Sequence, residues 1–283
     1  MKNILIIGKG YIGNHLYSEF TKHKFNVNIV SKNELDYTDV EELKKFLITS
    51  KKYHYVINCS GFTGIPNIDQ AEIKKVDCWK YNVRVPLDIC KICKQLNIQY
   101  INVSTGCIYT GYEKEYTEED IPNFGMFDTS SFYSKTKHAY ETLADYGMTL
   151  RIRMPFCNTQ CDKNFISKII KYNNIIDYKN SKTYVTDIIN FLMHFMTNNT
   201  HSATDVGILN FVNPDALYTK ELAKILTHRN LHNPNWQFTD IQNLQLAAPR
   251  SNCVLSTNKL NTMFPQFKMQ SEKDAILSAI QNW

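Results

Sequence analysis

Near its start the chain carries an apolar run, ILII, that leads directly into three glycines in the string GKGYIG. Such a run is typical of a β-strand covered on both faces. The spacing G-x-G-x-x-G fits a tight turn into a helix. The first glycine, Gly8, permits the turn, Gly10 lets backbone approach a ligand, and Gly13 lets the helix pack on the strand. We therefore predict a strand, a glycine turn and a helix as the first elements.

The same rhythm continues through the first half of the chain, where short β-rich runs alternate with longer amphipathic segments. This alternation is typical of βαβ units and a parallel sheet. We predict strands at 3–8, 26–30, 55–60, 99–105, 149–154 and 207–212. The fold class is therefore α/β, a doubly wound parallel sheet of the Rossmann type.

From about Pro155 onward the rhythm weakens and turn residues become more frequent. We expect the Rossmann domain in residues 1–155, with contributions from about 182–212. A smaller C-terminal lobe, mainly residues 156–283, would bind the substrate. Helices are predicted in this lobe at 218–227 and 272–281.

The amino-acid composition indicates which classes of ligand the protein binds and where it is found. The 283 residues are 43% hydrophobic and carry a formal net charge of +5, with lysines scattered rather than clustered. This pattern favours a small anionic ligand over nucleic acid. No stretch approaches the roughly 18 apolar residues of a membrane span, so we expect a cytoplasmic protein. The eight cysteines do not resemble a disulfide framework, and Cys90 and Cys93 lie in a helical pattern, so no metal site is expected.

The glycine turn predicts a dinucleotide cofactor whose pyrophosphate lies on the helix N-terminus, at Gly8, Gly10, Tyr11, Ile12 and Gly13. The strand 26–30 is followed by Ser31 and Lys32, where an acidic residue would bind the ribose hydroxyls of NADH. A hydroxyl and a cation suit a 2′-phosphate, so NADPH is favoured. Asp36 either contacts the adenine or caps the next helix. Ser60 and Gly61 end the strand 55–60, at the edge where such sheets bind ligands.

A candidate catalytic pair lies in SSFYSKTKHAYE, where Tyr133 and Lys137 are four residues apart and share a helix face. A lysine ammonium would lower the tyrosine pKa from about 10 and make the phenol a usable proton donor. Alone, this spacing also fits an exposed surface pair. The string Ser104-Thr105-Gly106-Cys107 at the end of strand 99–105 strengthens the catalytic interpretation, because active sites lie at such strand ends.

These residues together resemble the extended short-chain dehydrogenase/reductases. The resemblance implies that Thr105 orients the substrate oxygen, that Tyr133 supplies its proton, and that Lys137 also holds the nicotinamide ribose. Asn82 in KYNVRVP matches a position that often supports the catalytic lysine in this superfamily. Asparagine otherwise has little reason to lie inside a helix.

A closer resemblance covers nearly the whole chain. The strings GFTGIPNID, STGCIY, EEDIPNF, SFYSKTK, LRIRMPF, NFISKI and APRSN resemble the plant-type bifunctional UDP-4-keto-6-deoxyglucose 3,5-epimerase/4-reductases of UDP-rhamnose synthesis. The resemblance implies epimerisation at C3 and C5 of a UDP-sugar, then reduction of its C4 ketone by NADPH. Because no dehydratase precedes the reductase here, we expect the 4,6-dehydratase to be a separate chain. A homodimer would be usual in this superfamily.

Epimerisation needs two acid/base groups near one sugar ring. Cys107 would point into the site if its strand continued past Thr105, although a cysteine is more commonly a small core residue. Lys168 matches the family's second epimerase residue, although lysines usually face water. Arg250 is a candidate for the substrate diphosphate or for a structural ion pair. Thr63 and Asn164 complete the predicted substrate contacts.

Three other functions stay open at this point. A plain 4-keto-sugar reductase would act after a separate epimerase, and Cys107 argues against it because simple reductases carry no thiol there. A non-catalytic regulatory subunit would not need Thr105, Tyr133 and Lys137 together. A redox-sensing NADP-binding protein would use the many cysteines without turning over a keto sugar.

Overall fold

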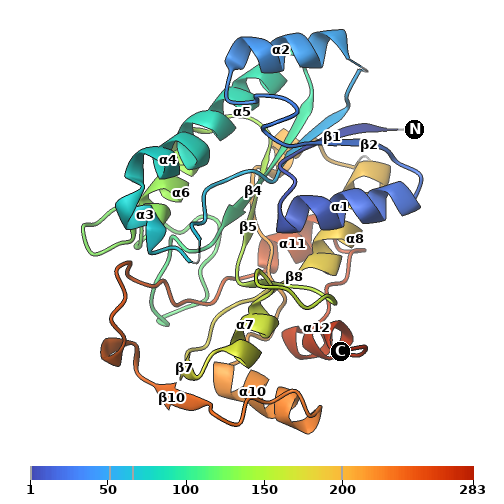
Figure 1. Ribbon diagram of the computed structural model, residues 1–283. Helices are drawn as coiled ribbons and strands as arrows, with labels where there is room; N and C mark the ends of the chain where they lie inside the picture. The colour runs from blue at the N-terminus through green and yellow to red at the C-terminus, as the bar shows by residue number, and fades with distance from the viewer. Residues whose placement is uncertain (1, 51, 66, 199) are drawn as a thin grey trace.

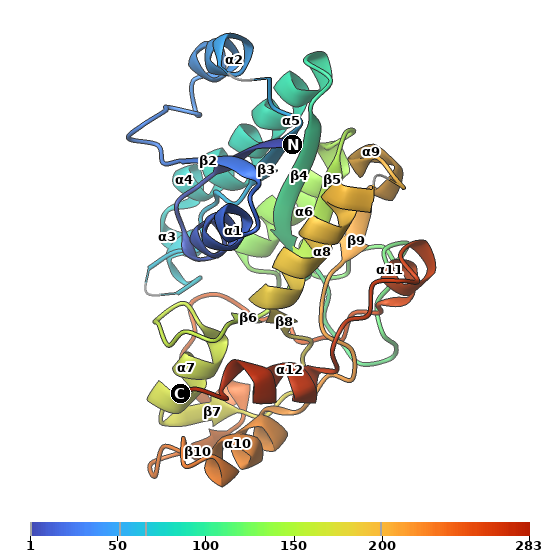
Figure 2. The same ribbon diagram turned by 90° about the vertical axis from the view of Figure 1, so that its right-hand side faces the viewer.

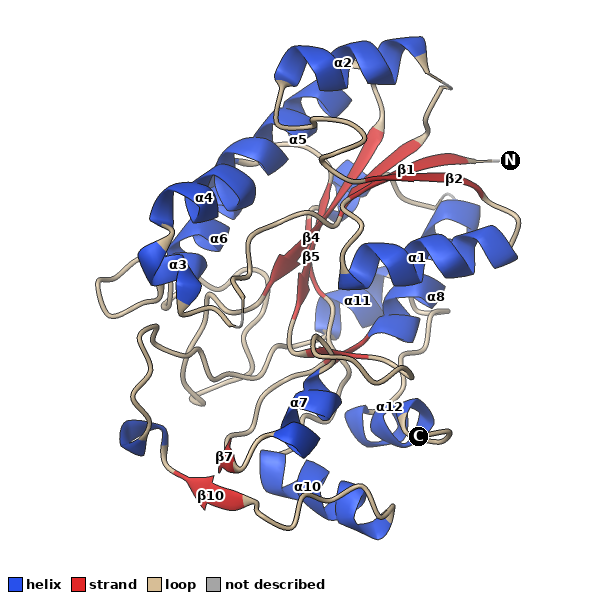
Figure 3. Ribbon diagram, in the orientation of Figure 1, coloured by secondary structure: helices blue, strands red, loops and turns tan. Residues whose placement is uncertain are grey.

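The computed structural model describes residues 2–50, 52–65, 67–198 and 200–283. At its centre is a six-stranded sheet with the order β2-β1-β3-β4-β5-β9, in which every neighbouring pair is parallel (Figure 3). The strands are β1 (Asn3–Ile7), β2 (Asn26–Val30), β3 (Tyr55–Asn58), β4 (Gln99–Thr105), β5 (Met148–Ile152) and β9 (Ile208–Asn210). The predicted α/β fold with a doubly wound parallel sheet is confirmed.

Helices cover both faces of this sheet, as Figures 1 and 2 show, with α1 and α8 on one face and α2, α5 and α6 on the other. The helices of this part are α1 (Tyr11–Lys22), α2 (Val40–Thr49), α3 (Gln70–Ile73), α4 (Lys75–Trp79), α5 (Val85–Gln95), α6 (Phe132–Leu143), α8 (Val185–Asn198), α9 (Ala203–Val206) and α11 (Asn258–Met263). A π-helical turn, Lys80–Arg84, joins α4 to α5.

The apolar strands are buried on both sides, as their composition predicted. In β1, Ile4 and Ile6 belong to the core cluster that includes α1 and α8, whereas Leu5 and Ile7 belong to the cluster beneath α2 and α5. Full burial of one such side chain contributes about 1.5–3 kcal/mol. Two separate cores therefore hold the sheet in place and present its carboxyl edge to the rest of the chain.

The order in which strands are added to the sheet reverses between β1 and β3, because β2 lies on one side of β1 and the later strands lie on the other. β1 pairs with β2 on one side and with β3 on the other. In open parallel sheets, ligands bind in the crevice at the carboxyl ends of strands where such a reversal occurs. The glycine turn after β1 and the loop after β3 meet at this crevice.

Four predicted strands end earlier than expected, among them β1 at Ile7 rather than residue 8 and β9 at Asn210 rather than residue 212. β3 ends at Asn58 rather than residue 60, and β5 ends at Ile152 rather than residue 154. Met154 has a positive φ of 40°, which is incompatible with continued strand geometry. Beyond β5, α11 packs against β9, a contact that no periodicity in the sequence indicated.

The remaining elements lie together below the carboxyl edge of the sheet in Figure 1. They are β6 (Pro155–Phe156), α7 (Phe165–Lys171), β7 (Asn174–Ile176), β8 (Thr183–Tyr184), α10 (Thr219–His228), β10 (Gln237–Thr239), a 3₁₀ turn (Ile241–Asn243) and α12 (Glu272–Ala279). A third core cluster unites α7, α10 and α12. The helices predicted at 218–227 and 272–281 correspond to α10 and α12.

Within the described ranges, no helix combines the length and apolarity needed to cross a membrane. The same residues contain no group of three or more histidine, cysteine or acidic side chains placed to hold a metal ion.

Candidate active site

The glycine turn has the geometry that a pyrophosphate needs. Gly8 has a φ of +107°, and a Cβ there would lie 2.8 Å from the backbone nitrogen of Ser60. A Cβ on Gly13 would lie 2.1 Å from the carbonyl oxygen of Gly8, so helix and turn pack too closely for any side chain. A Cβ on Gly10 would meet nothing within 4 Å. Gly10 therefore faces open space, which suits the close approach of a phosphate.

The first turn of α1 is also prepared for an anion. Gly10 is its N-cap, no side chain caps it, and its first turn contains no acidic residue. Tyr11 and Ile12 pack their side chains against the core, which leaves the backbone N–H groups of the turn for a ligand. The residues predicted around the pyrophosphate fit a dinucleotide.

The predicted 2′-phosphate residues are engaged with neighbours. The backbone N–H and the hydroxyl of Ser31 both donate to Glu34 Oε2 at 2.8 Å, and Lys9 forms an ion pair with the same carboxylate. The Lys9 hydrogen bond holds the pKa of Glu34 near 2. Lys32 instead donates to the Tyr81 hydroxyl at 3.1 Å. Sequence reasoning missed Glu34, although it lies only three residues after Ser31.

Asp36 was left open between an adenine contact and a helix cap, and the cap is wrong. Asp39 is the N-cap of α2 and accepts from the backbone N–H groups of Glu41 and Glu42. The Asp36 carboxylate accepts from the N–H and hydroxyl of Thr38 instead. The adenine contact stays a prediction.

The loop after β3 is held by Asn82, which lies in the π-helical turn. Its amide oxygen accepts from the N–H of Phe62 at 2.8 Å, and its amide nitrogen donates to the Phe62 carbonyl at 3.0 Å. A Cβ on Gly61 would lie 3.2 Å from Asn82 Oδ1 and 3.5 Å from Lys137 Nζ. Asn82 therefore positions the loop with Ser60 and Gly61 beside Lys137, which explains an asparagine inside a helix.

Thr105, Tyr133 and Lys137 come together at the carboxyl end of β4. Ser131 caps α6 and so fixes where the helix begins, two residues before Tyr133. All three side chains are at most 8% exposed, and Lys137 Nζ lies 5.8 Å from the Tyr133 ring centroid. A surface pair, the alternative interpretation of this spacing, is therefore wrong.

The pKa directions at this pair differ from the sequence expectation. Burial raises the pKa of Tyr133, and the neighbouring Cys107 adds to the rise, whereas the Thr105 hydrogen bond and the Arg153 charge oppose it. Burial lowers the pKa of Lys137 to about 8. The expected lowering of the tyrosine pKa is wrong, because desolvation outweighs the Thr105 hydrogen bond and the Arg153 charge. A raised pKa keeps the phenol protonated and makes it a weaker acid than free tyrosine.

Cys107 lies near Tyr133, as predicted, but not because the strand continues past Thr105. The strand ends at Thr105, and the Cys107 N–H donates to Thr105 Oγ1 at 3.2 Å, which turns the chain. The half-buried thiol then packs against the small buried cluster that contains Tyr133. Arg153, which sequence reasoning did not single out, donates to Cys107 Sγ at 3.6 Å. Its place in the string LRIRMPF was the available signal.

Lys168 lies on α7, outside this cluster. The side chain is half-buried, and burial, followed by the charge of Lys163, lowers its pKa. Asn164 is fully buried and caps α7, accepting from the N–H of Ile166 and donating to the carbonyls of Cys157 and Thr159. The substrate contact predicted for Asn164 and the acid/base role of Lys168 stay predictions.

A pocket of about 270 Å³ joins the loop after β3 to the segment before α7. It contains Gly61 and Thr63 from the first segment and Lys163 from the second, with Lys74 beside them. The two ammonium groups were missed from the sequence and suit a diphosphate. Arg250 lies against Asp69 in the ion-pair arrangement.

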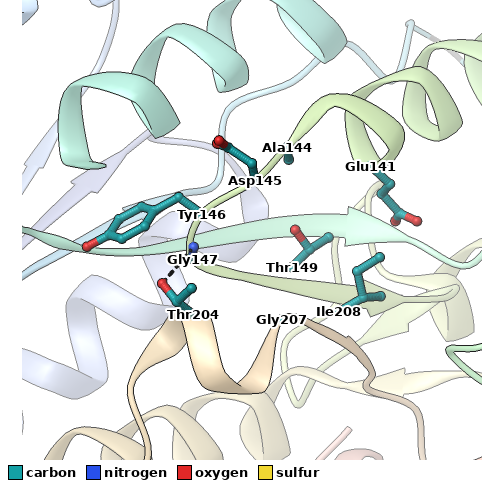
Figure 4. Close-up of a pocket in the computed structure, with 9 residues that line it drawn as sticks. All are labelled: Glu141, Ala144, Asp145, Tyr146, Gly147, Thr149, Thr204, Gly207 and Ile208. Carbon is teal, nitrogen blue, oxygen red and sulfur yellow. Dashed lines mark hydrogen bonds between the residues drawn. The ribbon is translucent and has the colours of Figure 1, made fainter. Parts of the chain in front are cut away.

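A second pocket, of about 230 Å³, lies at the opposite edge of the sheet (Figure 4). It is lined from the amino ends of β5 and β9 and from the end of α6, and Gly147 N–H donates there to Thr204 Oγ1 at 3.2 Å. Ligands of open parallel sheets bind at the carboxyl edge. The candidate active site is therefore the cluster around Tyr133.

Comparisons with known proteins identify relatives of this chain. The bifunctional dTDP-4-dehydrorhamnose 3,5-epimerase/dTDP-4-dehydrorhamnose reductase of Arabidopsis thaliana is 33% identical over 248 residues, 82% of this chain and 78% of that protein. The trifunctional RHM1 protein of the same plant, a UDP-glucose 4,6-dehydratase/UDP-4-keto-6-deoxy-D-glucose 3,5-epimerase/UDP-4-keto-L-rhamnose-reductase, is 33% identical over 234 residues. These cover 77% of this chain, which spans only 33% of that protein.

Among solved structures, the crystal structure of the L780 UDP-rhamnose synthase from Acanthamoeba polyphaga mimivirus superposes with a TM-score of 0.84. It shares 28% sequence identity, and the match covers 99% of both chains. The family model described as the RmlD substrate binding domain matches residues 1–282. The chain therefore belongs to the RmlD substrate-binding family of reductases, which is related to the short-chain dehydrogenase/reductases.

Proposed function

We propose that this protein is an NADPH-dependent 4-keto-6-deoxy-sugar reductase that first epimerises C3 and C5 of UDP-4-keto-6-deoxyglucose and so produces UDP-L-rhamnose. One observation carries the proposal. A hydroxyl, a thiol, a phenol and an ammonium, from Thr105, Cys107, Tyr133 and Lys137, gather at the carboxyl end of β4 beside the glycine turn. A reductase needs the first, third and fourth of these groups, and epimerisation gives the thiol a task.

For the reduction, bound NADPH supplies the hydride. Tyr133 donates its proton to the C4 oxygen as negative charge develops there, and its raised pKa keeps that proton in place until then. Thr105 holds the same oxygen through its hydroxyl. Lys137 would bind the nicotinamide ribose, because Gly61 brings the cofactor loop within reach of its ammonium.

For the epimerisation, the C4 ketone makes the hydrogens at C3 and C5 acidic. As the Cys107 thiolate takes a proton from carbon, the C–H bond breaks and an S–H bond forms. The electron pair moves into a C=C bond, and the negative charge arrives on the C4 oxygen, where Thr105 and Tyr133 stabilise it. A proton returned to the opposite face, with Lys168 as the proposed donor, inverts the carbon.

The nucleotide half of the substrate would lie over the pocket that contains Thr63. Its diphosphate matches the ammonium groups of Lys74 and Lys163, and Arg250, which is paired with Asp69, is a further candidate. The 4-keto sugar must come from a 4,6-dehydratase, and we propose that a separate protein supplies it. A homodimer remains part of the same proposal.

The test supplies UDP-4-keto-6-deoxyglucose and NADPH, follows the loss of NADPH absorbance, and determines the product configuration by NMR. We expect NADPH oxidation and the L-rhamno configuration. Oxidation with retained gluco configuration at C3 and C5 would leave only a reductase. Tyr133→Phe serves as the control, because it removes the proton donor without changing the cofactor loop; binding without oxidation is expected.

A further inference from the structure

Arg153 is a buried cation without a carboxylate partner. Its side chain is 1% exposed, and in the described part of the chain no ion pair joins its guanidinium to an acidic residue. Its partners are neutral: the Gly106 carbonyl at 3.1 Å, Ser251 Oγ at 2.8 Å and Asn180 Oδ1 at 2.7 Å. Its Nε has no hydrogen-bond partner. Burying a charge without an opposite charge is costly, so a structural role alone does not explain this arrangement.

The neighbouring Arg151 shows what a structural arginine looks like in this fold. Arg151 is also buried, and its guanidinium donates to Glu141 through Nε at 3.0 Å and Nη2 at 2.8 Å. Arg153 lies two residues further along the chain, just after the end of β5, and its guanidinium has no carboxylate partner among the described residues. The difference points to a transient or ligand-dependent anion as the partner of Arg153.

The ionisable groups that face Arg153 come from three segments. They are Cys107 and Tyr112 after β4, Tyr133 on α6, and Cys253 in the segment before α11; the ammonium of Lys182 lies near enough to add positive charge. Lys137, on α6, lies near enough to the Cys107 thiol to interact with it electrostatically. Of the sulfur atoms, Cys107 Sγ accepts from Arg153 Nη1 at 3.6 Å, and only Cys107 is partly accessible, because Cys253 is fully buried.

Gly106 makes the contact possible. A Cβ on Gly106 would lie 3.3 Å from Arg153 Cδ and 2.4 Å from Leu255 Cδ1. The arginine stem therefore packs directly on the glycine that separates Thr105 from Cys107. This explains the glycine in the string STGC by packing rather than by turn geometry.

We propose that Arg153 is the positioning residue that stabilises the Cys107 thiolate, and this inference rests on the proposed epimerase role of Cys107. While sulfur carries the negative charge, the guanidinium is its counter-ion. When the sulfur takes the proton from the sugar carbon, the charge passes to the C4 oxygen. Arg153 also acts on Tyr133, which faces that oxygen. One buried cation therefore serves both positions of the charge without moving.

The test measures alkylation of Cys107 by iodoacetamide, located by mass spectrometry, at pH 7.5 and at pH 10. Only the thiolate reacts, so Arg153→Met should slow labelling about tenfold at pH 7.5. At pH 10, well above the pKa of an ordinary cysteine in a model peptide, the rates should converge. A change in access alone would slow labelling equally at both pH values and would overturn the proposal.

Asn180→Asp tests the same idea with the guanidinium kept in place. This near-isosteric change puts a carboxylate 2.7 Å from Arg153 and supplies the missing counter-ion, at the cost of the hydrogen bond from Asn180 Nδ2 to Asn252 Oδ1, and a thermal unfolding curve checks that the fold holds. Labelling at pH 7.5 should fall about three- to tenfold because the cation is then neutralised. The matched control Ser251→Ala removes the hydrogen bonds from Arg153 Nη1 and to the Tyr109 carbonyl and leaves the charge, so labelling should stay within about twofold of wild type.

These measurements need no substrate, so the two proposals fail separately. Unchanged labelling in both Arg153→Met and Asn180→Asp would reject the pairing of Arg153 with the thiolate. The expected labelling pattern in a protein that does not epimerise UDP-4-keto-6-deoxyglucose would keep the pairing and reject the proposed function.

Discussion

Arg250 Nη1 lies 2.9 Å from Asp69 Oδ1, and the backbone N–H of Ala248 donates to the same oxygen at 2.9 Å. Burial tends to raise the pKa of Asp69, but the bonds from Arg250 and Ala248 outweigh it and the pKa is lowered. The pair joins the segment that rises from β10 to the loop after β3. It therefore ties these two segments together and links two of the strings that carry the family resemblance.

Asp69→Asn is expected to raise the KM for the UDP-sugar while kcat changes little, because the loop loses its tie but the catalytic groups stay. A partly exposed ion pair is worth about 1 kcal/mol, or about fivefold. If Arg250 also holds the diphosphate, Arg250→Met should raise KM more than Asp69→Asn does. Steady-state kinetics of the two variants, side by side, measure the difference. Equal effects would assign Arg250 to the ion pair alone.

The rate of reduction should fall as the pH rises through about 8. Burial is the main cause of the lowered pKa of Lys137, which is about 8, so the ammonium is present below that pH and lost above it. Without the charge, the ribose contact and the support for proton delivery both weaken. In Lys137→Arg, the group stays charged, so the alkaline fall should move to higher pH at a lower plateau. A profile of kcat against pH that is flat to pH 10 in the wild type would contradict this account.

Glu34 should weaken the preference for NADPH over NADH. Its carboxylate occupies the Ser31 donors that would otherwise receive a 2′-phosphate, and its charge repels that group. Glu34→Gln is expected to tighten NADPH binding about three- to tenfold and to leave NADH binding unchanged or weaker. Calorimetric titration of both cofactors checks this. Glu41→Gln, an exposed acid on α2, controls for net charge, and an equal gain there would remove Glu34 from cofactor selection.

The buried ion pair between Lys182, just before β8, and Glu272, at the start of α12, should stabilise the packing of these two elements. Lys182 Nζ lies 2.6 Å from Glu272 Oε1 and also donates to the carbonyls of Asn180 and Leu217, so the buried ammonium is fully satisfied. Removing one partner leaves an uncompensated charge. Lys182→Met is therefore expected to lower the free energy of unfolding by about 3–5 kcal/mol.

The double variant Lys182→Met/Glu272→Leu should cost less than the sum of the two single changes, because neither charge then remains. Urea unfolding curves measure all three variants. Lys171→Met is the control, because its ion pair with Asp162 is exposed and should contribute little. Additive losses in the double variant would show that the two charges do not depend on each other.

Much of the fold follows from local sequence signals. The apolar runs predict the six strands because both faces of a parallel sheet are covered, and the boundaries of β2 and β4 match the prediction. α11 was not predicted, because its six residues are too few to show a helical periodicity. The shorter end of β5 depends on the positive φ of Met154, which sequence does not reveal for a non-glycine residue.

The residues of the candidate site likewise fall into those that the sequence could predict and those that it did not. Gly8, Gly13 and Asn82 could be chosen from sequence because close packing or a helix interior restricts what fits there. Arg153 and Glu34 were missed because their contacts depend on which side chains face them across the fold, although Arg153 lies in the string LRIRMPF. The turn at Gly106 shows the limit most clearly: Cys107 was predicted in the site from a continuing strand, whereas a Thr105 hydrogen bond turns it there.

The most direct test of the central claim is solvent deuterium exchange into UDP-4-keto-6-deoxyglucose in D₂O without NADPH, followed by NMR. The account predicts that the wild-type protein introduces deuterium at C3 and C5 and that Cys107→Ser, with cofactor binding intact, does not. Exchange at an unchanged rate in Cys107→Ser, or none in the wild type, would contradict it.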